Sequence, residues 1–149
     1  MRSVVQRVTR AAVRVDHKKI GAIDHGLMVL LGVHRDDTLK DVSWMADRLV
    51  HLRIFDDPDG RMNRSLMNIG GEMLVVSQFT LMGDCRKGRR PSWSAAAPPE
   101  LAFTLYRELI EAVDRLGIRT ATGEFQATME VSLVNSGPVT LLLDSHKDF

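Results

Sequence analysis

The chain has 149 residues, of which 44% are hydrophobic and 26% charged, and its formal net charge is +1. These proportions suit a single folded domain over residues 1–149, and a net charge so close to zero identifies no partner by itself. The sequence has no apolar run of the roughly 20 residues that a membrane-spanning helix needs, and its one cysteine, Cys85, cannot form an internal disulfide, so we expect a cytoplasmic protein.

The first third of the chain predicts strands and then a helix. Residues 3–15 alternate apolar and polar side chains, which predicts two short antiparallel strands. The continuous apolar run 27–33 predicts a strand that is buried on both faces. Thr38 and Asp41 form a capping-box pattern, and apolar residues recur behind them at helical spacing. We therefore expect a helix over residues 38–52.

The middle of the chain predicts two strands, a long loop and a second helix. Residues 53–55 predict a short strand, and residues 72–81 predict a longer one. Residues 82–98 show no such periodicity and are expected to form a loop. The Pro-Pro-Glu run at 98–100 opens a helix, because proline lacks the N–H that the first helical turn leaves unpaired, and Gly117 ends it.

Residues 126–143 close the chain as strands on either side of Gly137-Pro138. Such a pair marks either a tight turn or a place where backbone groups are held away from the sheet ladder to face a ligand, and the residues alone leave both readings open. The strands outnumber those that two helices can cover. We therefore expect an α/β domain with helices against a mixed sheet and a second β layer.

Polar groups gather at one predicted strand end, Ser77-Gln78-Phe79-Thr80. Two hydroxyls, an amide and an aromatic ring at a strand end suit a ligand site, with Ser77 or Thr80 as a candidate nucleophile. The alternative is a strand whose polar side chains simply face solvent. A hydroxyl nucleophile needs an adjacent base, and no histidine lies nearby in the sequence.

Four cations crowd the predicted loop after this strand, and Trp93 follows them; they are Arg86, Lys87, Arg89 and Arg90. Clustered cations with an aromatic ring are typical of surfaces that bind phosphate backbones and unstacked bases. The alternative is a solvated charged loop. No histidine or cysteine spacing is typical of zinc, and the acidic turn 56–60 lacks the ligand pattern of a calcium loop, so we expect no metal and no cofactor.

Six segments, in order over nearly the whole chain, resemble the D-aminoacyl-tRNA deacylase family. They are residues 5–8, 52–55, 76–81, 86–92, 95–100 and 133–140. The most specific are Ser-Gln-Phe-Thr-Leu at 77–81 and Gly-Pro-Val-Thr at 137–140. A related deacylase has Pro-Gln-Ala-Thr-Leu in place of the first, so this chain carries the D-aminoacyl form.

The resemblance implies a homodimer of three-layer α/β/β sandwiches with mixed sheets and two helices. It implies a hydrolase that cleaves the ester bond between a D-amino acid and the terminal adenosine of tRNA, and that also cleaves glycyl-tRNA. Gly137-Pro138 would be a cis pair that enters the partner subunit's pocket and excludes L-side chains by steric clash, with Arg7 holding the pair in place. The partner molecule that the resemblance implies is the acceptor end of an aminoacyl-tRNA.

The resemblance also assigns roles to residues. Those in catalysis are Gln78, Phe79, Thr80, Gly137 and Pro138, those that contact substrate are Ser77, Met129 and Arg7, and those that bind tRNA are Arg86, Lys87, Arg89 and Arg90. An aminoacyl ester is already activated, so orienting a water and stabilising an oxyanion at backbone N–H groups would suffice. The family's favoured mechanism uses the tRNA 2′-OH, and an older proposal makes Thr80 the nucleophile. The lack of a nearby histidine favours the first.

The chain departs from the family pattern at Gln126, where glycine is commoner, and at Ser136, where aspartate is commoner. The first departure bears on the shape of the pocket near Met129. Two rival functions are a nucleic-acid-binding module without catalysis, which would use the basic loop 86–93, and a hydroxyl-nucleophile hydrolase of small esters. A pure binder would not need both the 77–80 segment and Gly137-Pro138.

Overall fold

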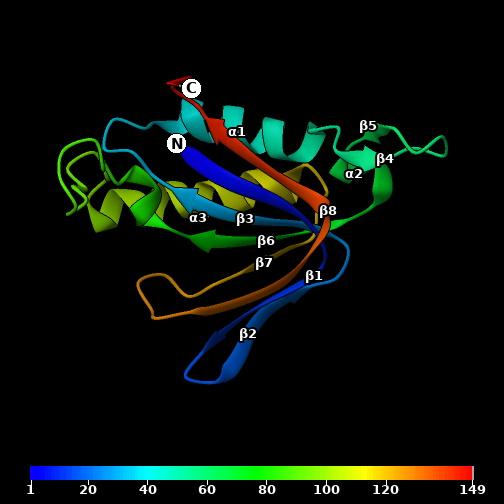
Figure 1. Cartoon of the computed structure of the whole chain (residues 1–149), viewed down its shortest axis with the longest axis horizontal. Helices are drawn as coiled ribbons and strands as arrows, with labels where there is room; N and C mark the ends of the chain where they lie inside the picture. Colours follow the sequence, from blue (N-terminus) through cyan, green and yellow to red (C-terminus); the bar gives the residue numbers. More distant parts are fainter. Residues whose placement is uncertain (149) are drawn as a thin grey trace.

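The computed structural model describes residues 1–148 and has three layers: two long helices, a central sheet and a second β layer on its far side (Figure 1). In chain order the elements are β1 (Arg2–Val15), β2 (Lys18–Ile23), β3 (Gly26–Gly32), α1 (Leu39–His51), β4 (Phe55–Asp56), β5 (Met62–Arg64), α2 (Leu66–Ile69), β6 (Glu72–Ser77), the 3₁₀ helix η1 (Phe79–Met82), α3 (Pro99–Arg115), β7 (Thr120–Thr122) and β8 (Glu130–Asp144). The expected α/β architecture is confirmed.

Strand β1 belongs to both β layers. Residues 2–8 pair antiparallel with β3, residues 11–15 pair antiparallel with β2, and β8 runs antiparallel along the other edge of β1. The expectation of two strands within residues 3–15 is therefore wrong. The hairpin turn comes later, at Asp16 and His17, whose φ angles of 47° and 63° suit a two-residue hairpin turn.

Alternate side chains of the central strands fill the two spaces between the layers. Leu27 and Val29 of β3 pack in the core beneath the helices, whereas Met28 packs with Val13 and Leu74 in the core between the two β layers. A strand that is covered on both faces has no polar side to show, which explains its continuous apolar run. The predicted strand at 27–33 is confirmed.

Both long helices form where the capping signals place them. In α1 the backbone N–H of Thr38 donates to the Asp41 carboxylate at 2.8 Å, which completes the predicted capping box. Helix α3 begins at Pro99 and buries an apolar stripe. The four-residue helix α2 was not expected, because it is too short to show periodicity. No helix among residues 1–148 has the length and apolar content to cross a membrane.

Two strand boundaries differ from the expectation. Strand β6 ends at Ser77, and the chain then turns through η1, so the strand expected to reach Leu81 is shorter. Strand β8 continues through Gly137 and Pro138 as one element, with shifts in its register against β1 on both sides of residue 8. The first difference frees the polar residues after Ser77 from the sheet ladder.

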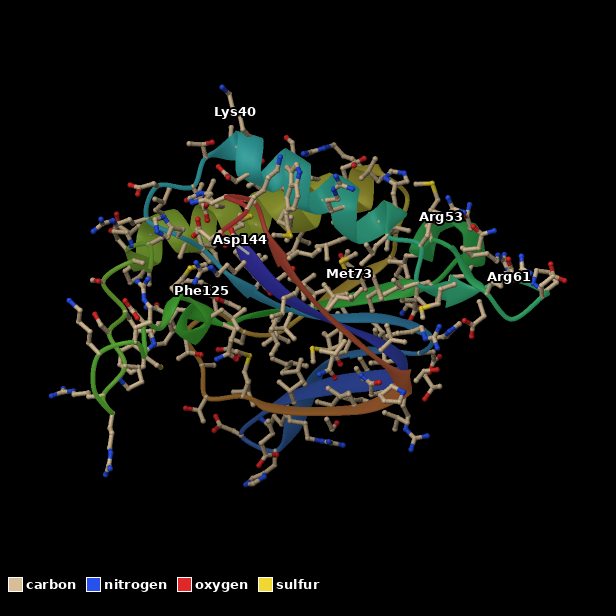
Figure 2. All side chains as sticks on the ribbon, turned by 45° about the horizontal axis from the view of Figure 1, so that its top comes forward. Lys40, Arg53, Arg61, Met73, Phe125 and Asp144 are labelled. Carbon is tan, nitrogen blue, oxygen red and sulfur yellow. The ribbon has the colours of Figure 1, made fainter. Side chains whose placement is uncertain are left out.

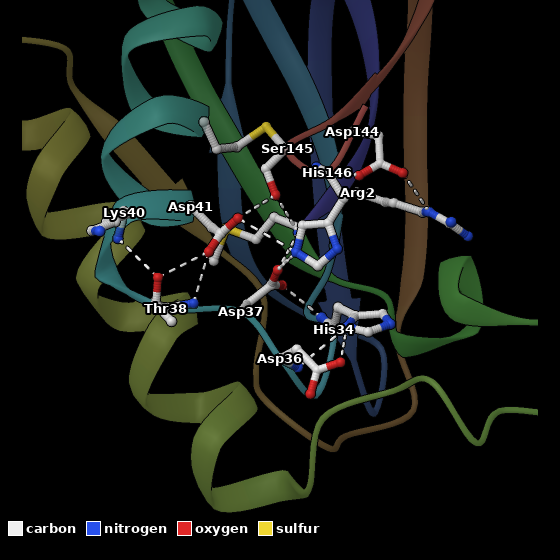
Figure 3. Close-up of polar contacts among 12 residues, drawn as sticks. Arg2, His34, Asp36, Asp37, Thr38, Lys40, Asp41, Asp144, Ser145 and His146 are labelled. Atoms are coloured by element: carbon white, nitrogen blue, oxygen red, sulfur yellow. Dashed lines mark hydrogen bonds and ion pairs between the residues drawn. The ribbon is translucent and has the colours of Figure 1, made fainter. Parts of the chain in front are cut away.

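A buried polar cluster ties the start and end of the described chain together (Figure 3). The ammonium of Met1 donates to Asp37 at 2.5 Å and to the Ser145 hydroxyl at 2.6 Å. The same carboxylate accepts from the backbone N–H of His34 at 2.6 Å and lies 2.9 Å from Nε2 of His146. Asp37 and Met1 are buried, so this cluster holds the end of the sheet at which β3 finishes.

Candidate active site

A cavity of about 570 Å³ opens at the end of the sheet where the parallel strands β3 and β6 finish. Ligands of parallel sheets bind in crevices outside the carboxyl ends of the strands. The walls come from the end of β6 and η1, from the start of α3, and from the segment that leads into β8. The lining residues are Val33, Val76, Ser77, Gln78, Phe79, Ala97, Pro99, Ala102, Phe125, Gln126, Ala127, Met129 and Val131.

The polar strand end forms the mouth of this cavity. The backbone N–H of Gln78 makes the last bond to the neighbouring strand, to the Leu31 carbonyl at 2.7 Å, and η1 begins directly afterwards. Because Phe79 and Thr80 begin η1, their N–H groups have no intrahelical acceptor, and none is found elsewhere within residues 1–148. The Phe79 side chain is 57% exposed, and its ring lies 5.9 Å from that of Trp93.

Thr80 has no base beside it within the described residues. The side-chain amide of Gln78 donates to the Thr80 hydroxyl at 2.5 Å. No histidine or carboxylate within residues 1–148 forms a hydrogen bond with that hydroxyl. A threonine can attack an ester only when a base takes its proton, so this geometry does not activate Thr80.

Phe125 forms part of the cavity wall and packs against two further aromatic rings. The ring of Phe125 lies 5.2 Å from Phe103 and 6.1 Å from Tyr106. The Tyr106 hydroxyl donates to the Val75 carbonyl at 2.8 Å, and burial raises the pKa of Tyr106 to about 12. The hydroxyl therefore stays protonated and holds α3 against β6, which fixes the wall that Phe125 presents.

Gln126 introduces strain into the same wall. Its φ angle is 64°, in the left-handed region, where a residue with a side chain pays about 1–2 kcal/mol relative to glycine. Its side-chain amide has no hydrogen-bond partner within the described residues. The cavity thus holds a strained residue whose amide is available to a ligand.

Gly137 and Pro138 lie within β8 beside Arg7 of β1, at the end of the sheet opposite to the cavity, and the peptide bond between them is cis. Both residues are exposed, and the Asn135 side chain brackets them by accepting from the Val139 N–H at 2.9 Å. The φ of Gly137 is 133°, and a Cβ there would stand 2.7 Å from a Val139 methyl and 3.1 Å from the Arg7 guanidinium. Only glycine fits this position without strain.

Arg7 supports this pair from behind and is 8% exposed. Its Nε donates to the Ser136 carbonyl at 3.0 Å, and its Nη1 donates to the Ile54 carbonyl at 2.7 Å and to the Asp56 carboxylate at 3.2 Å. The planar guanidinium can make several such bonds at fixed angles. The segment before Gly137 is therefore held by a fixed fork of donors.

Within one chain, the pair and the cavity do not meet. Arg7, beside the pair, is level with Leu27 of β3, whereas Ser77 is level with Leu31. Four residues along a strand correspond to roughly 13 Å, and the cavity opens beyond that point. Ser77, Gln78, Phe79 and Met129 are brought together, while Arg7 and the pair stand apart from them.

The four predicted tRNA-binding cations lie in an exposed loop after η1. Trp93, at the far side of this loop, contacts Phe79 at the cavity mouth, so the loop and the cavity are neighbours. Arg86 donates to Asp84 at 2.8 Å, and these hydrogen bonds hold the pKa of Asp84 well below its usual value. The other three cations have no ion pair within the described residues.

Sequence reasoning did not identify the cavity contributions of Val33, Ala97 and Ala102. Val33 follows β3 and Ala102 lies on α3, so tertiary packing alone brings them to the wall. The family-like run 95–100 was the one sequence signal for this part of the site.

Three comparisons show which known proteins this chain resembles. The family model described as D-Tyr-tRNA(Tyr) deacylase matches residues 4–144. The D-aminoacyl-tRNA deacylase of Desulfatibacillum aliphaticivorans is 63% identical over 145 residues, which cover 97% of this chain and 99% of that protein. The one of Thermosipho africanus (strain TCF52B) is 57% identical over 149 residues, which cover 100% of both chains.

Solved structures give the same fold. One described as c-Myc DNA Unwinding Element Binding Protein has a TM-score of 0.91 and 40% identity, over 97% of this chain and 98% of that one. Another, described as a probable eukaryotic D-amino acid tRNA deacylase, has a TM-score of 0.81 and 20% identity, over 95% of this chain and 97% of that one. At that lower identity the second likeness concerns the fold alone.

Proposed function

The chain belongs to the D-aminoacyl-tRNA deacylase family of ester hydrolases, and from this premise we propose that it cleaves D-aminoacyl-tRNA and mischarged glycyl-tRNA in the cytoplasm, releasing the free amino acid and tRNA. The observation that carries the proposal is the cavity of about 570 Å³ bounded by the 77–79 segment. Its size lies within the range of small-ligand sites, about 300–1,000 Å³. Beside its mouth, Lys87, Arg89 and Arg90 offer cations for the acceptor-end phosphates.

The chemistry we propose needs no protein nucleophile. The free N–H groups of Phe79 and Thr80 are the candidate donors to the oxyanion that forms when water attacks the ester carbonyl. The Thr80 hydroxyl accepts a hydrogen bond from Gln78 and contacts no base among residues 1–148. This supports the tRNA 2′-OH, rather than threonine, as the group that assists the water. Gln78 and Thr80 then serve to shape the donor loop.

We propose that chirality is read by a second copy of the chain. The Gly137-Pro138 pair is exposed and held by hydrogen bonds to its neighbours. It lies at the end of the sheet opposite to the cavity, so it does not reach the cavity of its own chain. In a homodimer the pair of one subunit would enter the cavity of the other and occupy the space that an L-side chain requires. Among the described strands β8 pairs with β1 alone, along one edge, and its Leu142 is 60% exposed, which suits an interface.

The direct test compares enantiomers. Purified protein is expected to release D-tyrosine from D-tyrosyl-tRNA, to hydrolyse glycyl-tRNA, and to leave L-tyrosyl-tRNA intact. Equal hydrolysis of both enantiomers, or none of the D form, would contradict the proposal. A Thr80→Ala variant is expected to hydrolyse D-tyrosyl-tRNA at a rate within about tenfold of the unmodified protein. A loss of more than about a thousandfold would support the mechanism in which threonine is the nucleophile.

A mixing experiment tests the cross-subunit arrangement. One variant, Ala127→Trp, blocks the cavity but keeps the pair, and the other, Gly137→Ala, disturbs the pair but keeps the cavity. In a mixed dimer the open cavity of the Gly137→Ala subunit would receive the intact pair of the Ala127→Trp subunit. Discrimination against L-tyrosyl-tRNA should therefore be stronger than in a dimer of either variant alone. An unchanged average would mean that the pair acts within its own chain.

A nucleic-acid-binding module without catalysis is the second candidate. It is supported by the exposed basic loop and by the similarity to a protein described as binding a DNA unwinding element. This candidate predicts retention of tRNA on the protein with the ester intact. Binding of RNA and DNA duplexes of equal length, measured beside hydrolysis, separates the two functions.

A further inference from the structure

A second groove, of about 470 Å³, lies on the outer face of the second β layer, across β1, β2 and β8. The groove and the candidate active site lie on opposite faces of β8, because successive side chains of a strand point to opposite faces. Val131 of β8 lines the active-site cavity, whereas Ser132 lines the groove. One strand therefore separates the two hollows.

The floor of this groove is made of small side chains. Ala12 of β1 pairs with Ala22 of β2 on one edge and with Ser132 of β8 on the other. Residues directly opposite each other in antiparallel strands share a face, so these three side chains form one row across the three strands. The low row lets a ligand approach the sheet closely.

The rims of the groove carry cations. Arg10 and Arg14 lie on the same face of β1 on either side of the floor, and Lys19 pairs with Arg14. All three are exposed, and their side chains have no ion pair or hydrogen bond within residues 1–148. Of the acids nearby, Asp24 lines the groove and Glu130 pairs with Arg14. The lining thus holds three cations against one carboxylate.

We propose that this groove binds the sugar-phosphate backbone of the tRNA acceptor stem whose 3′ end occupies the adjacent cavity. The proposal rests on the function above, since it takes the same substrate. Arg10 and Arg14 stand four residues apart, roughly 13 Å along the strand, so they can contact separate phosphates. Phosphate contacts position a nucleic acid without reading its sequence, which suits an enzyme that must accept tRNAs for many amino acids.

The basic loop and the groove would then hold the substrate from two sides of the cavity. The loop approaches through Trp93 and Phe79 at η1, and the groove approaches through β8 at Ser132. A polyanion fits the unpaired cations, whereas a second copy of this chain would have to bury them without partners, at a high desolvation cost.

The test measures the binding of tRNA that carries no amino acid as a function of salt concentration. The triple variant Arg10→Ser, Arg14→Ser, Lys19→Ser removes three cations. Each lost phosphate contact lowers the slope of log Kd against log salt by about 0.7–0.9, so a slope smaller by about 2 and a Kd at least tenfold weaker at low salt are expected. The matched control is Lys40→Ser, Arg48→Ser, Arg61→Ser, which removes the same charges from α1 and from the β4–β5 hairpin; Figure 2 labels Lys40 and Arg61. Equal slopes in the two triple variants would overturn the proposal.

A second variant keeps all three cations. Ser132→Glu places an anion on the floor and is expected to weaken tRNA binding at least fivefold without changing the melting temperature. A shift of the monomer–dimer equilibrium in the triple variant, with an unchanged salt slope, would assign the groove to a second copy and overturn the RNA proposal. The binding assay uses tRNA that carries no amino acid. A failure to hydrolyse D-aminoacyl-tRNA would therefore contradict the proposed function and not the proposed binding groove.

Discussion

The two ends of the central sheet differ in how their polar groups are used. At the cavity end, the N–H groups of Phe79 and Thr80 and the amide of Gln126 have no partner within the described residues. At the other end, Arg7 makes three hydrogen bonds and Asn135 brackets the Gly137-Pro138 pair. A surface that receives a ligand needs unpaired groups, whereas a part that must enter another site needs its own groups satisfied and fixed. This difference is what the proposed insertion of the Gly137-Pro138 pair of one subunit into the cavity of another requires.

The largest effect is expected behind the cavity end, at Asp37. Asp37→Ala removes the carboxylate that accepts from the buried Met1 ammonium and from the partly buried His34 N–H, and it leaves both donors without this acceptor. Breaking a buried ion pair costs about 3–5 kcal/mol, which we expect to see in urea unfolding. Asp36→Ala is the control, because that neighbouring carboxylate is 69% exposed, and it should change stability by less than about 0.5 kcal/mol. Equal losses would mean that the cluster does not support the cavity end.

The next largest effect is expected at Arg7, which supports the Gly137-Pro138 pair. Arg7→Ala leaves the Ser136 and Ile54 carbonyls without their donor, and we expect a loss of about 3 kcal/mol together with weaker exclusion of L-tyrosyl-tRNA. Arg7→Lys keeps the charge but loses the fork, so discrimination should fall there as well. Stability and the ratio of D to L hydrolysis rates are measured side by side. Full discrimination in Arg7→Lys would show that charge alone supports the pair.

A smaller effect is expected at Gly137. Gly137→Ala forces a Cβ to within 2.7 Å of Val139 at a φ of 133°, and we expect a loss of about 2–3 kcal/mol. Gly60→Ala is the matched control: its φ is 76° but nothing lies within 4 Å, so only the cost of the backbone conformation, about 1 kcal/mol, applies. Thermal unfolding of both variants gives the difference that is due to the contacts.

The smallest effect reverses sign. Gln126→Gly relieves a left-handed backbone at the cavity wall, and after the extra entropy of glycine in the unfolded chain we expect a gain of roughly 0.5 kcal/mol. Thr128→Gly, two residues on and without a positive φ, should instead lose about as much. A gain in stability with a slower rate would show that the strained amide serves the substrate.

The sequence predicted those parts of the site that are local in the chain. The 77–80 segment could be recognised because hydroxyl, amide and aromatic groups gather at the end of a buried strand. The Gly-Pro pair could be recognised because it interrupts an apolar run, and its part in the site stays a prediction. That these two segments stand at opposite ends of the sheet depends on the pairing of β1 with β3 and β8, and no local pattern shows it.

The error in the fold has a physical cause. Thr9 and Arg10 are exposed in the middle of β1, and two polar residues in an alternating run resemble a turn. They are exposed because the strand passes there from one β layer to the other, where β8 also shifts its register. Strand β7 and helix α2 were missed because segments of three and four residues are too short for periodicity.

The shared strand β1 also determines how the molecule opens. Neighbouring strands lie along both of its edges over nearly its whole length, and its side chains enter both cores. The two β layers cannot separate unless the hydrogen bonds of β1 to its neighbouring strands are lost. The amides of β1 should therefore be among the last to exchange with deuterium, and their exchange should report the global free energy of unfolding. The loop after η1, in contrast, can fluctuate without disturbing that cooperative unit.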